Sequence, residues 1–409
     1  MRGCEKIHKF GKRDAHHSIK KIFLSNIFFV YCSELAFYRS AEKNGVDGVV
    51  MKIAIIGLGL IGGSMGLALR NWSRTEEGQA TNLELVGFDA KGKQRTLAER
   101  MNVCNRYTAT PMEAVKDADV VIIATPVLAV RDTFEDIREH LKPGAVVTDT
   151  CSTKRQVMTW AKELLPTTVS FVGGHPMAGK TASIEAADAN LFKDCTYCLM
   201  AAPGVKEEAI ENVTRLVTIF GAKAYFMDPV EHDSYTAAIS HLPYLAAVGL
   251  VNLAGTSPGW REMSRLASTG FQDTTRLAGG NLAMYVDICR TNSDALIGWL
   301  DRYQEQLTEL RNLIEQAGLF DERGRPKPEA LTDAAPLEQY LSQAAETRER
   351  WQASRQQPQV DEMGNVEMPT SKEIRSNYSR MLFGGLFAKK APRPDDPKNG
   401  PGSNSSDKG

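Results

Sequence analysis

Short apolar runs alternate with amphipathic stretches through the first half of the chain. Runs with the length and composition of buried strands are Ile53–Ile56, Leu83–Phe88, Val120–Ala124, Ala145–Thr148 and Val169–Val172. Between two of them, Val130, Phe134 and Ile137 recur at helical spacing. Strands that alternate with amphipathic helices predict a mostly parallel, doubly wound sheet of the Rossmann type. We place this α/β domain at residues 51–226.

The pattern changes to helical periodicity alone beyond residue 226. The clearest helix is expected to begin near Asn292–Ser293 and to end before Gly318. Its apolar positions alternate in steps of four and three, at Leu296, Leu300, Tyr303, Leu307, Leu310 and Ile314. This spacing suits packing against another long helix, either within the chain or across a dimer interface. We predict an all-helical domain over residues 227–325 and a homodimer formed through it.

The two ends of the chain differ from the middle. Residues 1–50 start basic and contain the apolar run Ile22–Cys32, which is short and interrupted for a membrane span. We interpret residues 1–50 as a disordered leader or upstream extension. Residues 326–409 are polar and are expected to be largely disordered, apart from an apolar island at Met381–Phe387. No other segment is expected to cross a membrane.

Overall charge and cysteine content exclude several classes of protein. The formal net charge is -1, which gives no broad attraction to nucleic acid or acidic membranes. The chain has 7 cysteines, an odd and scattered set, which favours a reducing compartment and a cytoplasmic location. Cys195 and Cys198 have no second pair to complete a zinc site, so we interpret them as buried thiols of a strand and expect no metal.

A glycine-rich turn follows the first strand directly and a helical stretch follows the turn. In this context Gly57 permits the tight turn, Gly59 lets the backbone approach a pyrophosphate, and Gly62 allows close helix–strand packing. The N-terminus of the helix offers unpaired N–H groups to the phosphates. The turn therefore predicts a dinucleotide site that also includes Leu60 and Ile61.

An acidic residue at the end of the second strand indicates which dinucleotide binds. Asp89 can accept hydrogen bonds from the ribose hydroxyls and would repel a 2′-phosphate, which favours NAD. Lys91 and Lys93 lie close by and leave NADP open as an alternative. Thr125 and Pro126 end another buried strand, where the cofactor crevice is expected, although solvated loop residues are also found at such positions.

Two further segments that follow predicted strands carry reactive side chains. They are Asp149–Lys154 (DTCSTK) and Gly173–Gly179 (GGHPMAG). If both strands are parallel to the first, Ser152 and His175 emerge at the edge of the sheet where a nicotinamide would lie. Oxidation of an alcohol requires a group that accepts the hydroxyl proton, and histidine suits this role. On residue type alone, a glycine-flanked histidine is more often a turn residue. The catalytic hypothesis for His175 therefore rests on its predicted position at this edge of the sheet.

These segments together resemble the prephenate/arogenate dehydrogenase family of tyrosine biosynthesis. The matches are GLGLIGGS (57–64), DTCSTK (149–154), GGHPMAG (173–179), EHD (231–233), SHLP (240–243) and GFQDTTRLAGGN (270–281). They occur in consistent order between about Met51 and Ile314. The resemblance implies NAD-dependent oxidation of the C4 hydroxyl of a cyclohexadienol, with loss of the ring carboxylate as CO2. The product would be 4-hydroxyphenylpyruvate from prephenate or tyrosine from arogenate.

The resemblance also implies roles for particular residues. His175 would accept the hydrogen bond from the C4 hydroxyl, with help from Ser152. Arg276 would bind a substrate carboxylate, since a guanidinium pairs with a carboxylate through two hydrogen bonds. Ser240 and His241 would lie at the substrate.

The chain departs from the family pattern at two places. Lys180 and Thr181 stand where some members have a Thr-Glu pair that faces the substrate, and Tyr244 stands where a second histidine often occurs. Loss of a nearby acidic side chain would weaken recognition of the ammonium group of arogenate. The sequence therefore leans toward prephenate and leaves arogenate open.

Four alternatives accompany this hypothesis. Arg276 could pair with Asp273, three residues earlier, and His241 could be a structural helix histidine. The chain could be a β-hydroxyacid dehydrogenase, although those enzymes use a lysine from the helical domain that has no equivalent in this sequence. It could also be a non-catalytic protein that responds to NAD, which would keep the glycines and Asp89 without the reactive side chains.

Overall fold

The computed structural model describes residues 50–180, 182–202, 204–328 and 333–356. The predicted leader, with the exception of residue 50, and the apolar island at Met381–Phe387 lie outside the described residues. The chain divides into two units, one up to Ser293 and one from Asp294 onward.

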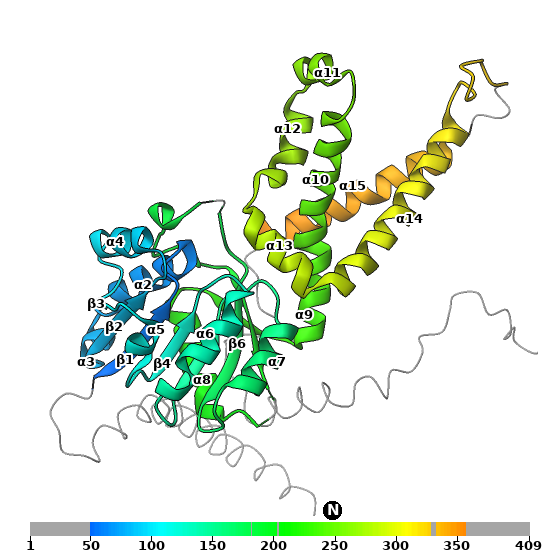
Figure 1. Ribbon diagram of the computed structural model, residues 1–409. Coiled ribbons are helices and arrows are strands. Elements are labelled where there is room, and N and C mark those ends of the chain that lie inside the picture. Colours follow the sequence, from blue (N-terminus) through cyan, green and yellow to red (C-terminus); the bar gives the residue numbers. More distant parts are fainter. Residues whose placement is uncertain (1–49, 181, 203, 329–332, 357–409) are drawn as a thin grey trace, which may run out of the picture. The chain divides into compact units, whose positions relative to one another are not determined.

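An eight-stranded sheet with the strand order β3-β2-β1-β4-β5-β6-β7-β8 forms the centre of the first unit (Figure 1). The strands are β1 (Met51–Ile56), β2 (Leu83–Phe88), β3 (Arg106–Tyr107), β4 (Val120–Ile123), β5 (Val146–Asp149), β6 (Ser170–Pro176), β7 (Thr196–Ala201) and β8 (Lys223–Phe226). Neighbouring strands are parallel except for β6 and β7, which are antiparallel. The predicted Rossmann-type sheet is confirmed.

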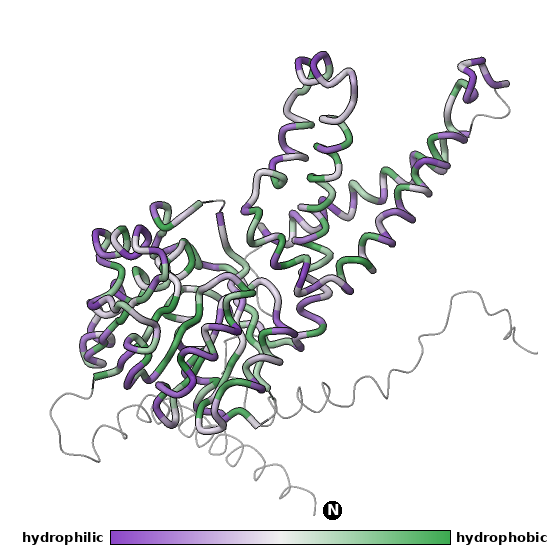
Figure 2. The backbone as a smooth tube through the Cα atoms, viewed as in Figure 1, coloured by the Kyte–Doolittle hydropathy of each residue, from purple (hydrophilic) through white to green (hydrophobic). Residues whose placement is uncertain are grey.

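Helices cover both faces of this sheet. They are α2 (Leu60–Trp72), α3 (Glu76–Ala80), α4 (Gly92–Arg100), α5 (Pro111–Val115), α6 (Ala129–Ile137), α7 (Arg155–Leu164) and α8 (Glu207–Ile219). Ile53 of β1 belongs to one apolar cluster with Met65 of α2, whereas Ile56 belongs to a second cluster with Phe134 of α6. Because successive side chains of a strand point to opposite faces, β1 is buried on both sides. This double burial explains why the strands are continuous apolar runs in the sequence (Figure 2).

Strand β6 is longer than the sequence predicts. The prediction ended this strand at Val172 and treated the glycines that follow as a turn, but β6 continues to Pro176 and pairs with β7. A glycine suits this stretch because a Cβ at Gly174 would lie 2.5 Å from the carbonyl oxygen of Asp149. His175 is therefore held in the sheet, opposite Cys198, and is not a turn residue.

The rest of the first unit is helical. It contains α9 (Pro229–Thr236), the π-helical turn η3 (Ala237–His241), α10 (Leu242–Gly255), α11 (Trp260–Leu266), α12 (Thr269–Thr275), the short 3-10 helix η4 (Arg276–Gly279) and α13 (Leu282–Thr291). Pro243 has no N–H to donate to the carbonyl of Ile239, and the helix widens into the π turn just before it. The absence of strands from residues 229–291, all of which are described, agrees with the predicted helical domain.

The continuous helical run Pro229–Gly255 corrects the expectation that no segment after the leader could cross a membrane. It has 27 residues and a mean hydropathy of 1.5, so its length and composition alone would allow it to cross a membrane. Only 22% of its most apolar window is buried, and Ile239 and Leu253 are 70% and 74% exposed. The described residues therefore leave an apolar face of this run uncovered.

The second unit consists mainly of two helices. The long helix α14 (Ser293–Ala317) begins and ends where the sequence predicts. The second helix, α15 (Ala335–Gln356), lies in the extension that we expected to be largely disordered, so that expectation is wrong for residues 335–356. The segment is rich in Ala, Gln, Glu and Arg, which have high helix propensity, and the hydroxyl of Tyr340 donates to Oε1 of Gln306 on α14 over 2.9 Å.

Candidate active site

The glycine turn between β1 and α2 is shaped by close backbone contacts. Gly57 has a φ of 98°, and a Cβ at this position would lie 2.5 Å from the carbonyl oxygen of Ala124. A Cβ at Gly62 would overlap the carbonyl oxygen of Gly57. A Cβ at Gly59, in contrast, would meet no atom within 4 Å. Gly57 and Gly62 therefore build the turn, whereas Gly59 borders open space.

This open space has the properties of a dinucleotide site. Gly59 is the N-cap of α2 and provides no side chain to the N–H groups of the first turn, which makes the helix end suitable for an anion. The carboxylate of Asp89 accepts hydrogen bonds from the N–H groups of Leu58 and Lys91, each over 2.8 Å. Carboxylate oxygens have further lone pairs, so this fixed carboxylate can also accept ribose hydroxyls. The residues present therefore fit a dinucleotide.

The other predicted cofactor residues lie at the same edge of the sheet. Thr125 and Pro126 follow β4, and the hydroxyl of Thr125 is buried with no hydrogen-bond partner among the described residues. Pro126 is exposed. Leu60 is buried, and Ile61 is partly buried against the apolar cluster of α2.

One side chain near the end of β6 and two from the middle of α9 form a hydrogen-bonded line. Nδ1 of His175 and Nε2 of His232 are 2.8 Å apart, and Nδ1 of His232 and Oδ1 of Asp233 are also 2.8 Å apart. His232 and Asp233 are fully buried and His175 is 9% exposed. Helix α9 begins at this place because the carboxylate of Asp228 accepts the N–H groups of its first turn.

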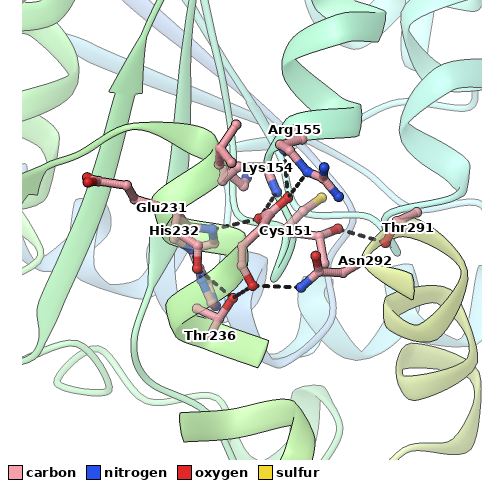
Figure 3. Close-up of polar contacts among 12 residues, drawn as sticks. Cys151, Lys154, Arg155, Glu231, His232, Thr236, Thr291 and Asn292 are labelled. Atoms are coloured by element: carbon pink, nitrogen blue, oxygen red, sulfur yellow. Dashed lines mark hydrogen bonds and ion pairs between the residues drawn. The ribbon is translucent and has the colours of Figure 1, made fainter. Parts of the chain in front are cut away.

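Asp233 also ties α9 to the start of α7 (Figure 3). Its carboxylate accepts the N–H groups of Lys154 and Arg155 over 2.7 and 2.9 Å. Its carbonyl oxygen accepts a hydrogen bond from Nδ2 of Asn292 over 2.8 Å. A carboxylate at the N-terminus of a helix is stabilised by the helix dipole. Asp233 therefore joins the histidine line to α7 and to the end of α13.

A buried ion pair holds the residue before His175. Lys154 and Asp149 are both 0% exposed; Nζ of Lys154 donates to the Asp149 carboxylate and, over 2.6 Å, to the carbonyl oxygen of Gly174. The other carboxylate oxygen of Asp149 accepts the N–H of Gly174 over 3.1 Å. The two ends of the DTCSTK segment thus fix both polar groups of Gly174, and with them the backbone position of His175.

The histidines of this site are held in their neutral form. Burial lowers the pKa of His175 well below 6.5, and positive charge on His232, Lys154 or His241 acts in the same direction. Burial also lowers the pKa of His241 to about 4. The pKa of His232 is lowered by burial, against the opposing effect of Asp233. A neutral imidazole at position 175 can accept a proton at neutral pH.

The structure places the remaining predicted residues as follows. Ser152 is partly exposed in the loop after β5 and makes no hydrogen bond with His175. His241 is buried in η3, and its Nδ1 has no hydrogen-bond partner among the described residues. Ser240, also in η3, is half-buried. Arg276 is exposed on η4 and forms no ion pair with Asp273.

The sequence indicates no role in the site for several residues of the network. They are Asp149, Lys154, His232, Asp233 and Asn292, and Asn292 is expected only near the start of the long helix. The first four lie in the family matches DTCSTK and EHD, where the resemblance points to Ser152 alone. A single sequence does not show whether a lysine or an aspartate is buried. The resemblance of DTCSTK and EHD to the family was therefore the signal that could have pointed to these residues. Within the part of the chain that the structure describes, no group of metal-ligating side chains is arranged to hold an ion.

A cofactor site and a neutral histidine at the carboxyl edge of one mostly parallel sheet define a dinucleotide-dependent dehydrogenase with a helical C-terminal domain. The family model of the prephenate dehydrogenase nucleotide-binding domain matches residues 66–226, and that of the prephenate dehydrogenase dimerization domain matches residues 228–321. The chain belongs to the prephenate dehydrogenase family.

Individual relatives agree with this assignment. The chain is 34% identical to prephenate dehydrogenase of Bacillus subtilis over 269 residues, which cover 64% of this chain and 70% of the relative. It is 29% identical to cyclohexadienyl dehydrogenase of Zymomonas mobilis, over 65% of this chain and 89% of that protein. The crystal structure of Synechocystis arogenate dehydrogenase is similar with a TM-score of 0.60 at 28% identity, covering 74% of this chain and 100% of the other.

Proposed function

We propose that this chain catalyses the oxidative decarboxylation of prephenate to 4-hydroxyphenylpyruvate, with NAD as the hydride acceptor. The observation that carries the proposal is a neutral, buried His175 at the same sheet edge as the Gly57–Gly62 turn. Family membership and the names of the relatives support the reaction class. The carboxylate of Asp89, fixed by two backbone N–H groups, supports NAD in preference to NADP.

The chain's own residues supply the proton transfer. His175 accepts the proton of the C4 hydroxyl while the C4 hydride leaves, and bound NAD provides the acceptor for that hydride. The bond between the ring and its carboxylate then breaks, CO2 departs, and the electron pair makes the ring aromatic. The C4 oxygen, now a phenolate, takes the proton back from His175. One hydride and one CO2 leave the substrate with no net release of a proton.

The remaining site residues bind and orient the substrate in this proposal. Arg276 has an exposed guanidinium without an ion-pair partner among the described residues, and it pairs with a substrate carboxylate. Ser152 orients the hydrogen bond between His175 and the C4 hydroxyl. Ser240 and His241 line the substrate site from η3.

Prephenate is the preferred substrate in this proposal. Relatives carry names that refer to prephenate, cyclohexadienyl and arogenate substrates, so family membership alone leaves the choice open. Lys180 and Thr181 occupy the place where some members have an acidic residue. Without that acidic side chain, the keto group of prephenate is favoured over the ammonium group of arogenate.

We also propose a homodimer and a cytoplasmic location. Ile239, Leu253 and Leu282 on the helical part are exposed apolar side chains that a second copy of the chain can cover. The match to a dimerization domain supports this choice. In this proposal, residues 51–226 bind the cofactor, and residues 227–325 bind the substrate and form the dimer. Residues 1–50 and 326–409 are flanking extensions.

The test is turnover by the full chain with prephenate or arogenate and with NAD or NADP. Prephenate with NAD is expected to give the highest kcat/KM. His175→Asn should lower kcat by about 10²–10⁴-fold with NAD affinity retained, because the loss is confined to the proton acceptor. Absence of turnover with both substrates by a folded protein that binds NAD would refute the proposal.

A further inference from the structure

We propose that His232 and Asp233 are positioning residues that keep the proton of His175 on Nδ1, so that Nε2 receives the hydroxyl proton of the substrate. The line of three side chains, joined by contacts of 2.8 Å, is the observation behind this inference. The identity of the substrate rests on the proposed function. The position of the proton on His175 does not.

Asp233 determines where the first proton of the line lies. Its carboxylate already accepts the N–H groups of Lys154 and Arg155 and is buried at the N-terminus of α7, where a negative charge is stabilised. An ionised carboxylate can only accept hydrogen bonds. The contact with His232 therefore requires His232 to carry a proton on Nδ1 and to donate it to Asp233.

The state of His232 then determines that of His175. Because the buried His232 is neutral near pH 7, a proton on its Nδ1 leaves Nε2 as an acceptor. The contact between the two rings then requires His175 to donate from its own Nδ1. The lone pair of His175 is left on Nε2, and this atom has no hydrogen-bond partner among the described residues.

The other charged or titratable groups around His175 do not compete for its Nδ1. Lys154 directs its ammonium group to Asp149 and to the carbonyl oxygen of Gly174. His241, from η3, is neutral near pH 7 because burial holds its pKa at about 4. His232 is thus the partner that orients the ring. A base whose proton is already on the correct nitrogen needs no rearrangement when the substrate binds.

The test compares two substitutions of His232 in the full chain. His232→Leu removes the acceptor, and kcat with prephenate is expected to fall by about 10²-fold or more, with the KM values for both substrates changed by about threefold at most. His232→Gln places a side-chain oxygen near the position of Nε2 and should recover kcat to within about tenfold of the wild type. His140→Leu, at an exposed position in the 3-10 helix Arg138–His140, is the matched control and should behave as the wild type.

A spectroscopic readout tests the proton position without turnover. In protein with 15N-labelled histidine, the signals of His175, assigned by their loss in His175→Asn, should show a protonated Nδ1 and an unprotonated Nε2. In His232→Leu, this preference should be lost. A wild-type protein with its proton on Nε2 would overturn the inference, as would a His232→Leu variant that turns over like the wild type. If the wild type fails to oxidise prephenate, the proposed function fails, and the 15N spectrum still decides the role of His232.

Discussion

The dinucleotide turn and the histidine network lie at the same carboxyl edge of one sheet but are built from different atoms. The turn consists of backbone, with a φ of 98° at Gly57 and no atom within 4 Å of a Cβ at Gly59. The histidine network consists of buried side chains from β6, α9 and the loop after β5. Substitutions that add atoms should therefore disturb the turn, whereas substitutions that remove a hydrogen-bonding or charged side chain should disturb the network.

The largest effect is expected from breaking the buried ion pair. Lys154→Met leaves the carboxylate of Asp149 buried without its cation, which should lower the free energy of unfolding by about 3–5 kcal/mol. Lys162→Met, on the exposed side of α7, is the matched control and should change the free energy by less than about 0.5 kcal/mol. Urea unfolding measures both. Equal free energies of unfolding for Lys154→Met and Lys162→Met would show that the ion pair of Lys154 and Asp149 does not stabilise this edge of the sheet.

Two alanine substitutions in the turn should separate folding from cofactor binding. Gly62→Ala places a Cβ against the carbonyl oxygen of Gly57 and should cost about 1–3 kcal/mol of stability as well as NAD affinity. Gly59→Ala meets no protein atom and should weaken NAD binding by about tenfold with unchanged stability, because the added methyl group occupies the space of the pyrophosphate. Thermal unfolding and NAD titration distinguish the two. Equal stability losses in both variants would contradict the open space beside Gly59.

Charge removal at Asp89 should change the choice of cofactor. In Asp89→Asn, one negative charge that opposes a 2′-phosphate is lost, and the ratio of kcat/KM for NAD to that for NADP should fall by about tenfold. Glu99→Gln on the exposed end of α4 removes the same charge at a distance from the turn and should leave the ratio unchanged. An unaltered preference in Asp89→Asn would remove this carboxylate from cofactor selection.

Acid should destabilise the folded protein through the same histidines. In the unfolded chain, histidines titrate near about 6.5, whereas the folded pKa of His241 is about 4 and those of His175 and His232 are also lowered. Below about pH 6.5 the unfolded chain binds more protons, so stability should fall as the pH decreases toward the folded pKa values. The acid limb of kcat/KM should likewise lie below about pH 6.5. Urea unfolding at about pH 7.5 and about pH 5.5 measures the direction in which the free energy of unfolding changes. Higher stability at the lower pH would contradict neutral side chains at His175, His232 and His241.

The same difference between the two regions explains what could be predicted from the sequence. The turn is local: strand, glycines and helix follow one another between Met51 and Trp72, so their spacing predicts the structure. The predicted strands occur because each is an apolar run buried on both faces. In contrast, His175 and His232 are separated by 57 positions, and Lys154 and Asp233 by 79. Only the fold brings such partners together.

Two other departures have similarly physical causes. The glycines at 173 and 174 read as a turn, but they lie in β6 and pair with β7, and glycine is needed at 174 because a Cβ there would lie 2.5 Å from the carbonyl oxygen of Asp149. The polar residues of Ala335–Gln356 read as disordered, yet their helix propensity is high and they form α15. Composition alone could not separate a polar helix from a polar coil.

The most direct test of the proposed reaction measures both of its products at once. The full chain is supplied with prephenate and NAD, and NADH and CO2 are quantified in the same reaction, with His175→Asn as the control. We expect the two products in equal amounts from the wild type and a fall in both of about 10²–10⁴-fold in the variant. NADH without CO2 from the wild type, or equal rates in the wild type and in His175→Asn, would contradict the account.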